Sequence, residues 1–331
     1  MASLFVIILM LIGVIMLTNS ITATQNEGLF RLFDRMLLLT HLPLFLVGAA
    51  LLLLPAQAVA ALTAEGLPLT NFAAVGLVFI GMGVWGTAVS LKSARQFLAR
   101  WLPLNPHSPV HTLALALSAL LVGNTAITLS QGGLQEIAAT AQAADITEVV
   151  LQQALFVLLA LFGVGLLVRR QGHAISQRLG LEAMTAAHVR LGIRWIIILV
   201  LVQWAIGALW TVTNPEQAAL LDGISGELFG DFDTVWEWFV LALAAGMGEE
   251  LLFRGALQPV FGLWFTAVLF ALAHVQYGFT LITVAVFIIG VALGYIRQRT
   301  NTTVAIFVHF GYNFVLGLLT LLAAYLEQFI P

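Results

Sequence analysis

The stretch GMGEELLFRG, residues 246–255, places two adjacent carboxylates and an arginine inside a segment that is otherwise apolar enough to cross a membrane. Each ionisable side chain near the middle of a bilayer costs roughly 2.5 to 3.5 kcal/mol on insertion scales. Glu249, Glu250 and Arg254 therefore require partners, water or chemistry nearby. The stretch predicts a membrane-spanning fold and is the first place to look for an active site.

The composition of the whole chain is that of a membrane protein. Of its 331 residues, 61% are hydrophobic and only 9% are charged, whereas soluble domains carry about 25% charged residues. The net charge of −3 provides no basic face for nucleic acid. Cysteine is absent, which excludes disulfides, thiolate metal sites and cysteine nucleophiles.

Ten apolar runs have close to the ~20 residues that a helix needs to cross the hydrocarbon core, although a few are shorter. They lie near 3–19, 36–60, 71–91, 111–131, 149–168, 191–212, 236–258, 261–277, 281–296 and 304–325. Such long runs argue against a transmembrane barrel, whose strands show alternation over about ten residues each. We therefore expect an all-α, polytopic transmembrane helical bundle with about ten spans.

The Lys and Arg residues predict the orientation of the bundle. Apart from Arg254, they fall in alternate connections, and the connections between them contain none. The intervening connections, at 61–70, 132–148, 213–235 and 278–280, contain no Lys or Arg. Because cytoplasmic loops carry an excess of Lys and Arg, we expect both termini to face outward. No basic residue precedes Arg31, so we expect the first helix to be retained rather than cleaved as a signal peptide.

Polar side chains are unevenly distributed among the spans. The first five spans carry only scattered groups, such as Gln152. From residue 236 onward, the spans carry Glu, Arg, His and Asn at helical spacings. We therefore divide the chain into an N-terminal five-helix membrane region at 1–168, of unknown role, and a core at 190–325 in which the chemistry is concentrated.

Helical spacing separates the two adjacent carboxylates. Each residue of an α-helix advances by about 100°, so Glu250 and Arg254, four residues apart, share a face and can pair. Glu249 points about 100° away from that pair. We expect a structural ion pair between Glu250 and Arg254 that leaves Glu249 available. If the segment were only an ion pair, the second carboxylate would be unexplained.

Two later spans supply further polar side chains. Phe270 and His274 are four residues apart, and so are His309 and Asn313. A carboxylate, two imidazoles and a carboxamide on three helices can meet only inside the bundle. Such a cluster can bind a divalent metal, or orient a water and stabilise an oxyanion. The alternative is a set of polar residues that only hold helices together.

Three motifs, in order along the chain, carry a resemblance to a known family. They are Glu249-Glu250-xxx-Arg254, Phe270-xxx-His274 and His309-xxx-Asn313. Together they resemble the signature of the CPBP family, which comprises CAAX-processing type II endopeptidases and bacteriocin-processing enzymes and is also called the Abi family. The likeness covers about 190–325. It implies a helical intramembrane endopeptidase with a water-filled cavity among the motif helices.

The resemblance also implies a role for each motif residue. Glu249 would act as the general base on the attacking water, and His274 would hold or activate that water. His309 and Asn313 would stabilise the tetrahedral oxyanion. Glu250 and Arg254 would form a structural ion pair.

Whether a metal takes part is open from the sequence. The family is commonly called metalloprotease, and Glu249, His274 and His309 are acceptable ligands for a divalent metal such as zinc. The chain contains no HExxH segment, and a metal-free mechanism with Glu249 as the base is equally plausible.

The resemblance implies a multi-pass protein of a prokaryotic cell membrane, with the lipid bilayer as one partner. The other partner would be a membrane-anchored peptide or protein substrate, whether CAAX-like, bacteriocin-like or transmembrane. Two other functions are compatible with the residues. One is an ion- or proton-coupled transporter, in which buried acids and histidines relay ions. The other is a catalytically silent, protease-like immunity or binding protein that has kept the pocket.

Overall fold

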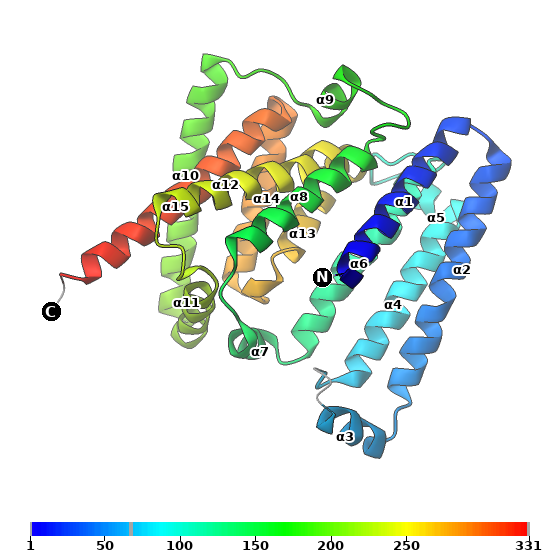
Figure 1. Cartoon of the computed structure of the whole chain (residues 1–331), viewed down its shortest axis with the longest axis horizontal. Coiled ribbons are helices and arrows are strands. Elements are labelled where there is room, and N and C mark those ends of the chain that lie inside the picture. The colour runs from blue at the N-terminus through cyan, green and yellow to red at the C-terminus, as the bar shows by residue number, and fades with distance from the viewer. Residues whose placement is uncertain (1, 66–68, 330–331) are drawn as a thin grey trace. The chain divides into compact units, whose positions relative to one another are not determined.

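The computed structural model describes residues 2–65 and 69–329. Residues 66–68, which fall in the predicted connection at 61–70, lie outside the described residues. Within the described ranges every regular element is a helix, so the predicted all-α fold is confirmed (Figure 1). Nine helical segments in these ranges are long and apolar enough to cross a membrane. The chain is therefore a multi-pass integral membrane protein.

The chain divides into two compact units. The first comprises residues 1–137 and 272–279, and the second comprises residues 138–271 and 280–331. The first contains α1 (Ala2–Thr24), α2 (Glu27–Leu52), α3 (Ala56–Ala64), α4 (Phe72–Ser90), α5 (Lys92–Leu98), α6 (Pro109–Ser130), most of α7 (Gly133–Thr140) and the short 3₁₀-helix η2 (Val275–Tyr277). The second contains α8 (Ile146–Gly163), α9 (His173–Leu179), α10 (Ala186–Thr213), α11 (Pro215–Phe229), α12 (Val235–Glu249), η1 (Glu250–Leu257), all but the last residue of α13 (Gln258–Leu272), α14 (Leu281–Arg299) and α15 (Thr302–Glu327).

In the first unit, α1, α2, α4 and α6 run alongside one another (Figure 1). Helices α2 and α4 touch through glycine, since a Cβ added to Gly48 would lie 2.7 Å from the carbonyl oxygen of Gly76. Small residues allow such close approach between membrane helices. At the end of α4, the buried Arg95 binds Asp34 at 2.7 Å and donates to the carbonyl of Val89 at 2.8 Å. These bonds hold α5 against α2 and the end of α4.

Helix α2 does not have the bounds that the sequence predicts for its span, 36–60. It begins earlier, at Glu27, because the side chain of Asn26 caps it by accepting from the amides of Gly28 and Leu29. It ends at Leu52, before Pro55.

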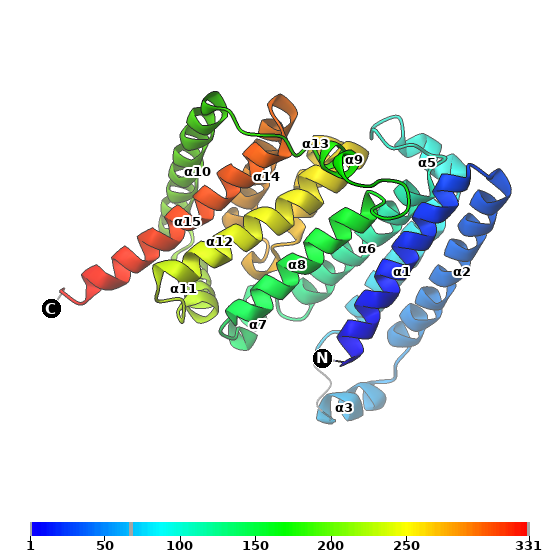
Figure 2. The same ribbon diagram turned by 45° about the horizontal axis from the view of Figure 1, so that its top comes forward.

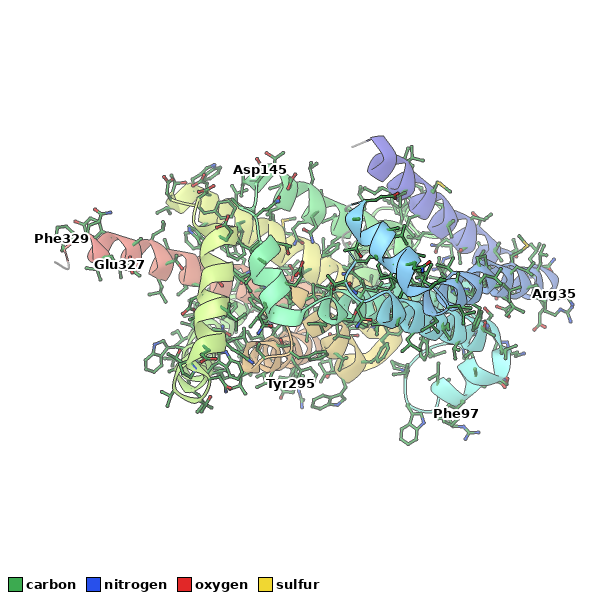
Figure 3. All side chains as sticks on the ribbon, turned by 90° about the horizontal axis from the view of Figure 1, so that it is seen from below. Arg35, Phe97, Asp145, Tyr295, Glu327 and Phe329 are labelled. Carbon is green, nitrogen blue, oxygen red and sulfur yellow. The ribbon has the colours of Figure 1, made fainter. Side chains whose placement is uncertain are left out.

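Large apolar side chains cover the outside of the helices. Leu46 on α2 and Trp204 on α10 are each 73% exposed, and Figure 3 labels the exposed Phe97 on α5. Soluble proteins rarely expose contiguous apolar surface on this scale, which marks a surface in contact with a membrane.

The predicted spans at 236–258 and 261–277 form one helical segment, Val235–Leu272. Two features interrupt it. Residues 250–257 form the π-helix η1, and such turns are frequent at functional sites. Gly262 has φ 74° and ψ 177°, a conformation that only glycine adopts readily. The chain therefore changes direction at Gly262, directly after the connection that the sequence predicts between 258 and 261.

In the second unit, α12 packs against α8 and α15 (Figures 1 and 2). Gly246 brings α12 onto α15, since a Cβ there would lie 3.0 Å from the backbone nitrogen of Phe310. Arg178 from α9 donates to the carbonyl of Gly255 at 2.8 Å, which fixes the far end of η1. The amide of Thr302 donates to the carbonyl of Gly180 at 2.8 Å, which anchors the start of α15. These contacts position the helices that carry the polar motifs.

Candidate active site

Glu250 lies at the centre of a buried cluster of charged and polar side chains. It is the first residue of η1 and is fully buried. One carboxylate oxygen, Oε2, lies 3.0 Å from Nε of Arg254, and the other, Oε1, lies 2.9 Å from Nδ1 of His309. Helical spacing predicts the contact with Arg254. It does not predict the contact with His309, because that residue is on another helix.

The aromatic ring of Phe270 packs beside the Glu250 cluster. The guanidinium carbon of Arg254 lies 4.6 Å from the centroid of its ring, within range of a cation–π contact. The ring centroid of His309 lies 5.9 Å away, with the two rings inclined by 70°. Phe253 packs edge-on against the same ring at 5.3 Å. The ring of Phe270 thus lies against Arg254 and His309.

Glu249 has a different neighbour from that of Glu250. It is the last residue of α12 and is buried. Its Oε1 accepts a hydrogen bond from Nε2 of Gln153, on α8, at 3.1 Å. The two adjacent carboxylates thus face different partners. One binds an arginine and a histidine, and the other binds a carboxamide.

Asn313 follows His309 by one turn of α15 and is half-buried. Asn301 caps this helix by accepting from the amide of Val304. Gly311 lies between the two motif residues, and the side chain of Ile196 on α10 occupies the space beside it, where a Cβ would collide. His309 and Asn313 are therefore held on a helix whose start and whose contact with α10 are both specified.

His274 belongs to the first unit, where it directly precedes η2. Its ring stacks on that of Tyr277 with centroids 6.2 Å apart and an interplanar angle of 7°. The hydroxyl of Thr125 on α6 donates to the carbonyl of Leu272 at 2.8 Å, which ties this segment to α6.

The sequence match to known families falls on these motifs. Residues 231–315 match the family model described as "Type II CAAX prenyl endopeptidase Rce1-like". Residues 231–315 form an Rce1-like domain. Comparison with curated proteins and comparison with solved structures gave no match. The family that this segment matches is one of proteases, as the motif resemblance implies.

The Rce1-like domain contains all six residues that the sequence singles out. These are Glu249, Glu250, Arg254, His274, His309 and Asn313. Gln153 lies outside the domain, on a helix that carries none of the three motifs. In the sequence, Gln153 could be noticed only as a polar carboxamide inside an apolar span, where such a group needs a partner.

The side chains of the Rce1-like domain do not form a recognisable metal site. Zinc in proteins is held by three or four side chains. Among residues 2–65 and 69–329, no group of three or more His, Asp or Glu side chains is placed to hold a metal ion. Nδ1 of His309 is engaged by Glu250, so Nε2 is the ring nitrogen that could bind a metal. The metal site that the sequence suggests at Glu249, His274 and His309 stays a prediction.

Proposed function

We propose that this protein is an intramembrane endopeptidase that hydrolyses peptide bonds of membrane-associated substrates through a water activated by Glu249. The observation that carries the proposal is that two adjacent carboxylates in an Rce1-like domain have different partners. Glu250 is engaged by Arg254 and His309. Glu249 accepts a hydrogen bond from the neutral carboxamide of Gln153, and a carboxylate can act as a general base.

In the proposed reaction, the Glu249 carboxylate takes a proton from water as the water oxygen attacks the carbonyl carbon of the scissile bond. His274 holds or activates that water. The oxyanion of the tetrahedral intermediate accepts hydrogen bonds from His309 and Asn313. When the intermediate collapses, the carbon–nitrogen bond breaks and Glu249 returns the proton to the leaving amine. The products are a carboxylate and an amine.

The contact between His309 and Glu250 supports this assignment. A carboxylate only accepts hydrogen bonds, so Nδ1 of His309 carries a proton and donates a hydrogen bond to Glu250. This bond orients the ring, and Nε2 is directed away from Glu250. When the ring carries both protons, Nε2 can donate to an oxyanion. Glu250 and Arg254 then serve as the support that holds this histidine.

For the substrate, we propose a membrane-anchored peptide or protein, either CAAX-like, bacteriocin-like or transmembrane. The family description names CAAX prenyl endopeptidases, and a buried site inside a span suits a substrate that is already in the bilayer. We assign the catalytic role to the core at 190–325 and no separate activity to the region at 1–168.

We further propose that the basic connections face the cytoplasm of a prokaryotic cell and both termini face outward. The loop before α9 supports this orientation. Burial, together with the neighbouring charges of Arg170, Arg297 and Arg169, lowers the pKa of Arg178 to about 10. Arginines from two basic connections thus gather at one place, as the positive-inside rule requires if these connections share a side.

The test is cleavage by purified protein in liposomes. Three fluorogenic peptides serve as substrates: a prenylated peptide with a C-terminal CAAX segment, a bacteriocin-type leader and a transmembrane peptide. We expect wild type to cut at least one of them and Glu249→Gln to lose the activity while remaining folded. Full activity in purified Glu249→Gln would overturn the proposal. So would proton flux across the liposomes without cleavage, which is the result expected of a transporter.

A further inference from the structure

We propose that Gln153 is a positioning residue for Glu249, supplied to the Rce1-like domain by a helix outside it. The inference rests on the function proposed above, because it assigns a role in the same reaction. Three features of the contact between α8 and α12 carry it.

The first feature is the close approach of the two helices at this point. A Cβ added to Gly248 would lie 2.7 Å from the backbone oxygen of Gln153 and 3.0 Å from its Cα, and it would collide with the side-chain Oε1. Only glycine at position 248 leaves room for the backbone of α8 and for this carboxamide. The residue before Glu249 thus creates the space that Gln153 fills.

The second feature is the hydrogen bond itself. Nε2 of Gln153 donates to Oε1 of Glu249 at 3.1 Å, and the two residues are 7% and 8% exposed. Because a carboxylate can only accept, this bond also determines which end of the carboxamide faces Glu249. Oε1 of Gln153 then lies against Gly248. A buried donor at one oxygen restricts the rotation of the carboxylate and leaves its orientation defined.

The third feature is the rest of the α8 face. One turn beyond Gln153, Phe156 packs edge-on against Phe253 of η1 at 6.5 Å. A further turn on, the fully buried Ala160 packs in one apolar cluster with Leu251. This face is apolar except at Gln153. Packing alone would be satisfied by an apolar side chain there, so the carboxamide marks a role beyond holding the helices together.

The neighbouring residue provides a matched control. Gln152 precedes Gln153 on the same helix but is exposed. Gln153→Met keeps the length of the side chain and removes the donor, whereas Gln152→Met makes the same chemical change without touching Glu249. We expect Gln153→Met to lower kcat by about 10- to 100-fold, the effect of a misplaced catalytic group. We expect KM to stay within about twofold, and Gln152→Met to match wild type in both constants.

A second variant, Gln153→Glu, distinguishes positioning from packing. The carboxyl group that this substitution introduces can donate to Glu249 only while it is protonated, and it repels Glu249 once both are ionised. We expect the activity of this variant relative to wild type to fall as the pH rises. The other ionisable groups of the cluster, Glu250, Arg254 and His309, are present in both proteins. Their titration therefore affects both profiles and does not create this difference.

The experiment measures kcat, KM and thermal unfolding for wild type and the three variants, on the peptide that wild type cleaves. The inference is overturned if folded Gln153→Met retains the kcat of wild type. It is also overturned if Gln153→Glu keeps a constant activity relative to wild type across the pH range. If wild type cuts none of the peptides, the proposed function fails, and the role of Gln153 fails with it.

Discussion

Glu250→Gln is expected to destabilise the protein strongly, whereas Glu249→Gln, at the adjacent position, is expected to leave its stability nearly unchanged. The two substitutions are chemically identical and lie one residue apart. They differ only in what each carboxylate contacts. The pair is therefore a direct test of the assignment of Glu250 to structure and Glu249 to chemistry.

The magnitude follows from the burial of the pair. The side chains of Arg254 and Glu250 are 1% and 0% exposed, so solvent does not screen either charge. Removing one partner of such a pair leaves an uncompensated buried charge and costs about 3 to 5 kcal/mol. The lost carboxylate contact with His309 acts in the same direction. In Glu249→Gln the amide can still accept from Gln153, so we expect a loss below about 1 kcal/mol.

The assay is reversible unfolding in mixed micelles with increasing denaturing detergent, followed by the fluorescence of the eight tryptophans. The double variant Glu250→Leu with Arg254→Met provides a further control. Replacing a whole buried pair by apolar residues is often neutral, so the double variant should be more stable than either single variant.

Two results would refute the reasoning. One is a free energy of unfolding for Glu250→Gln within about 1 kcal/mol of the wild-type value, well below the cost of an unpaired buried charge. The other is an equal loss in Glu249→Gln and Glu250→Gln, which would mean that both carboxylates are structural.

Two further predictions concern the helices that carry the site. Gly262→Ala should lower the free energy of unfolding by about 1 to 3 kcal/mol, because alanine is strained at this backbone conformation. The loss is measured in the same unfolding assay. The control is Gly13→Ala at an exposed position, where the added Cβ meets no atom within 4 Å. Asp145→Ala should speed hydrogen exchange at the amides of Thr147 and Glu148, which Asp145 caps at the start of α8. Hydrogen bonds from the Thr147 side chain and backbone hold the pKa of Asp145 below its usual 3.8, so the protection should be present above about pH 4 and be lost as the pH falls further. Asp145→Asn, which still caps but carries no charge, should keep the protection at every pH, and equal exchange in all three proteins would contradict the role of this cap.

Much of the fold could be predicted from the sequence because membrane helices are specified by local composition. The long apolar runs predict an all-α membrane bundle, and the structure confirms it. The details that failed were local departures from a regular helix. The π-helix at 250–257 and the change of direction at Gly262 depend on backbone geometry, which hydropathy does not record.

In the candidate site, too, some contacts could be predicted from the sequence and others could not. The spacing of Glu250 and Arg254 predicts a contact on one helix, and these side chains do pair. The bond between Gln153 and Glu249 joins residues 96 positions apart, and that between Glu250 and His309 joins residues 59 positions apart. Helical periodicity relates only neighbours on one helix, so neither contact could be derived from it.

By itself, the sequence determined that this protein spans a membrane through helices, and that costly polar side chains concentrate in its C-terminal part. Both are properties of segments about one helix long, which hydrophobic burial and helical geometry dictate directly. Only the tertiary structure decided which partners the two adjacent carboxylates have on other helices, His309 for Glu250 and Gln153 for Glu249. That choice depends on which helices pack against α12 and η1, and in this chain the glycines at 246 and 248 set how closely α15 and α8 approach.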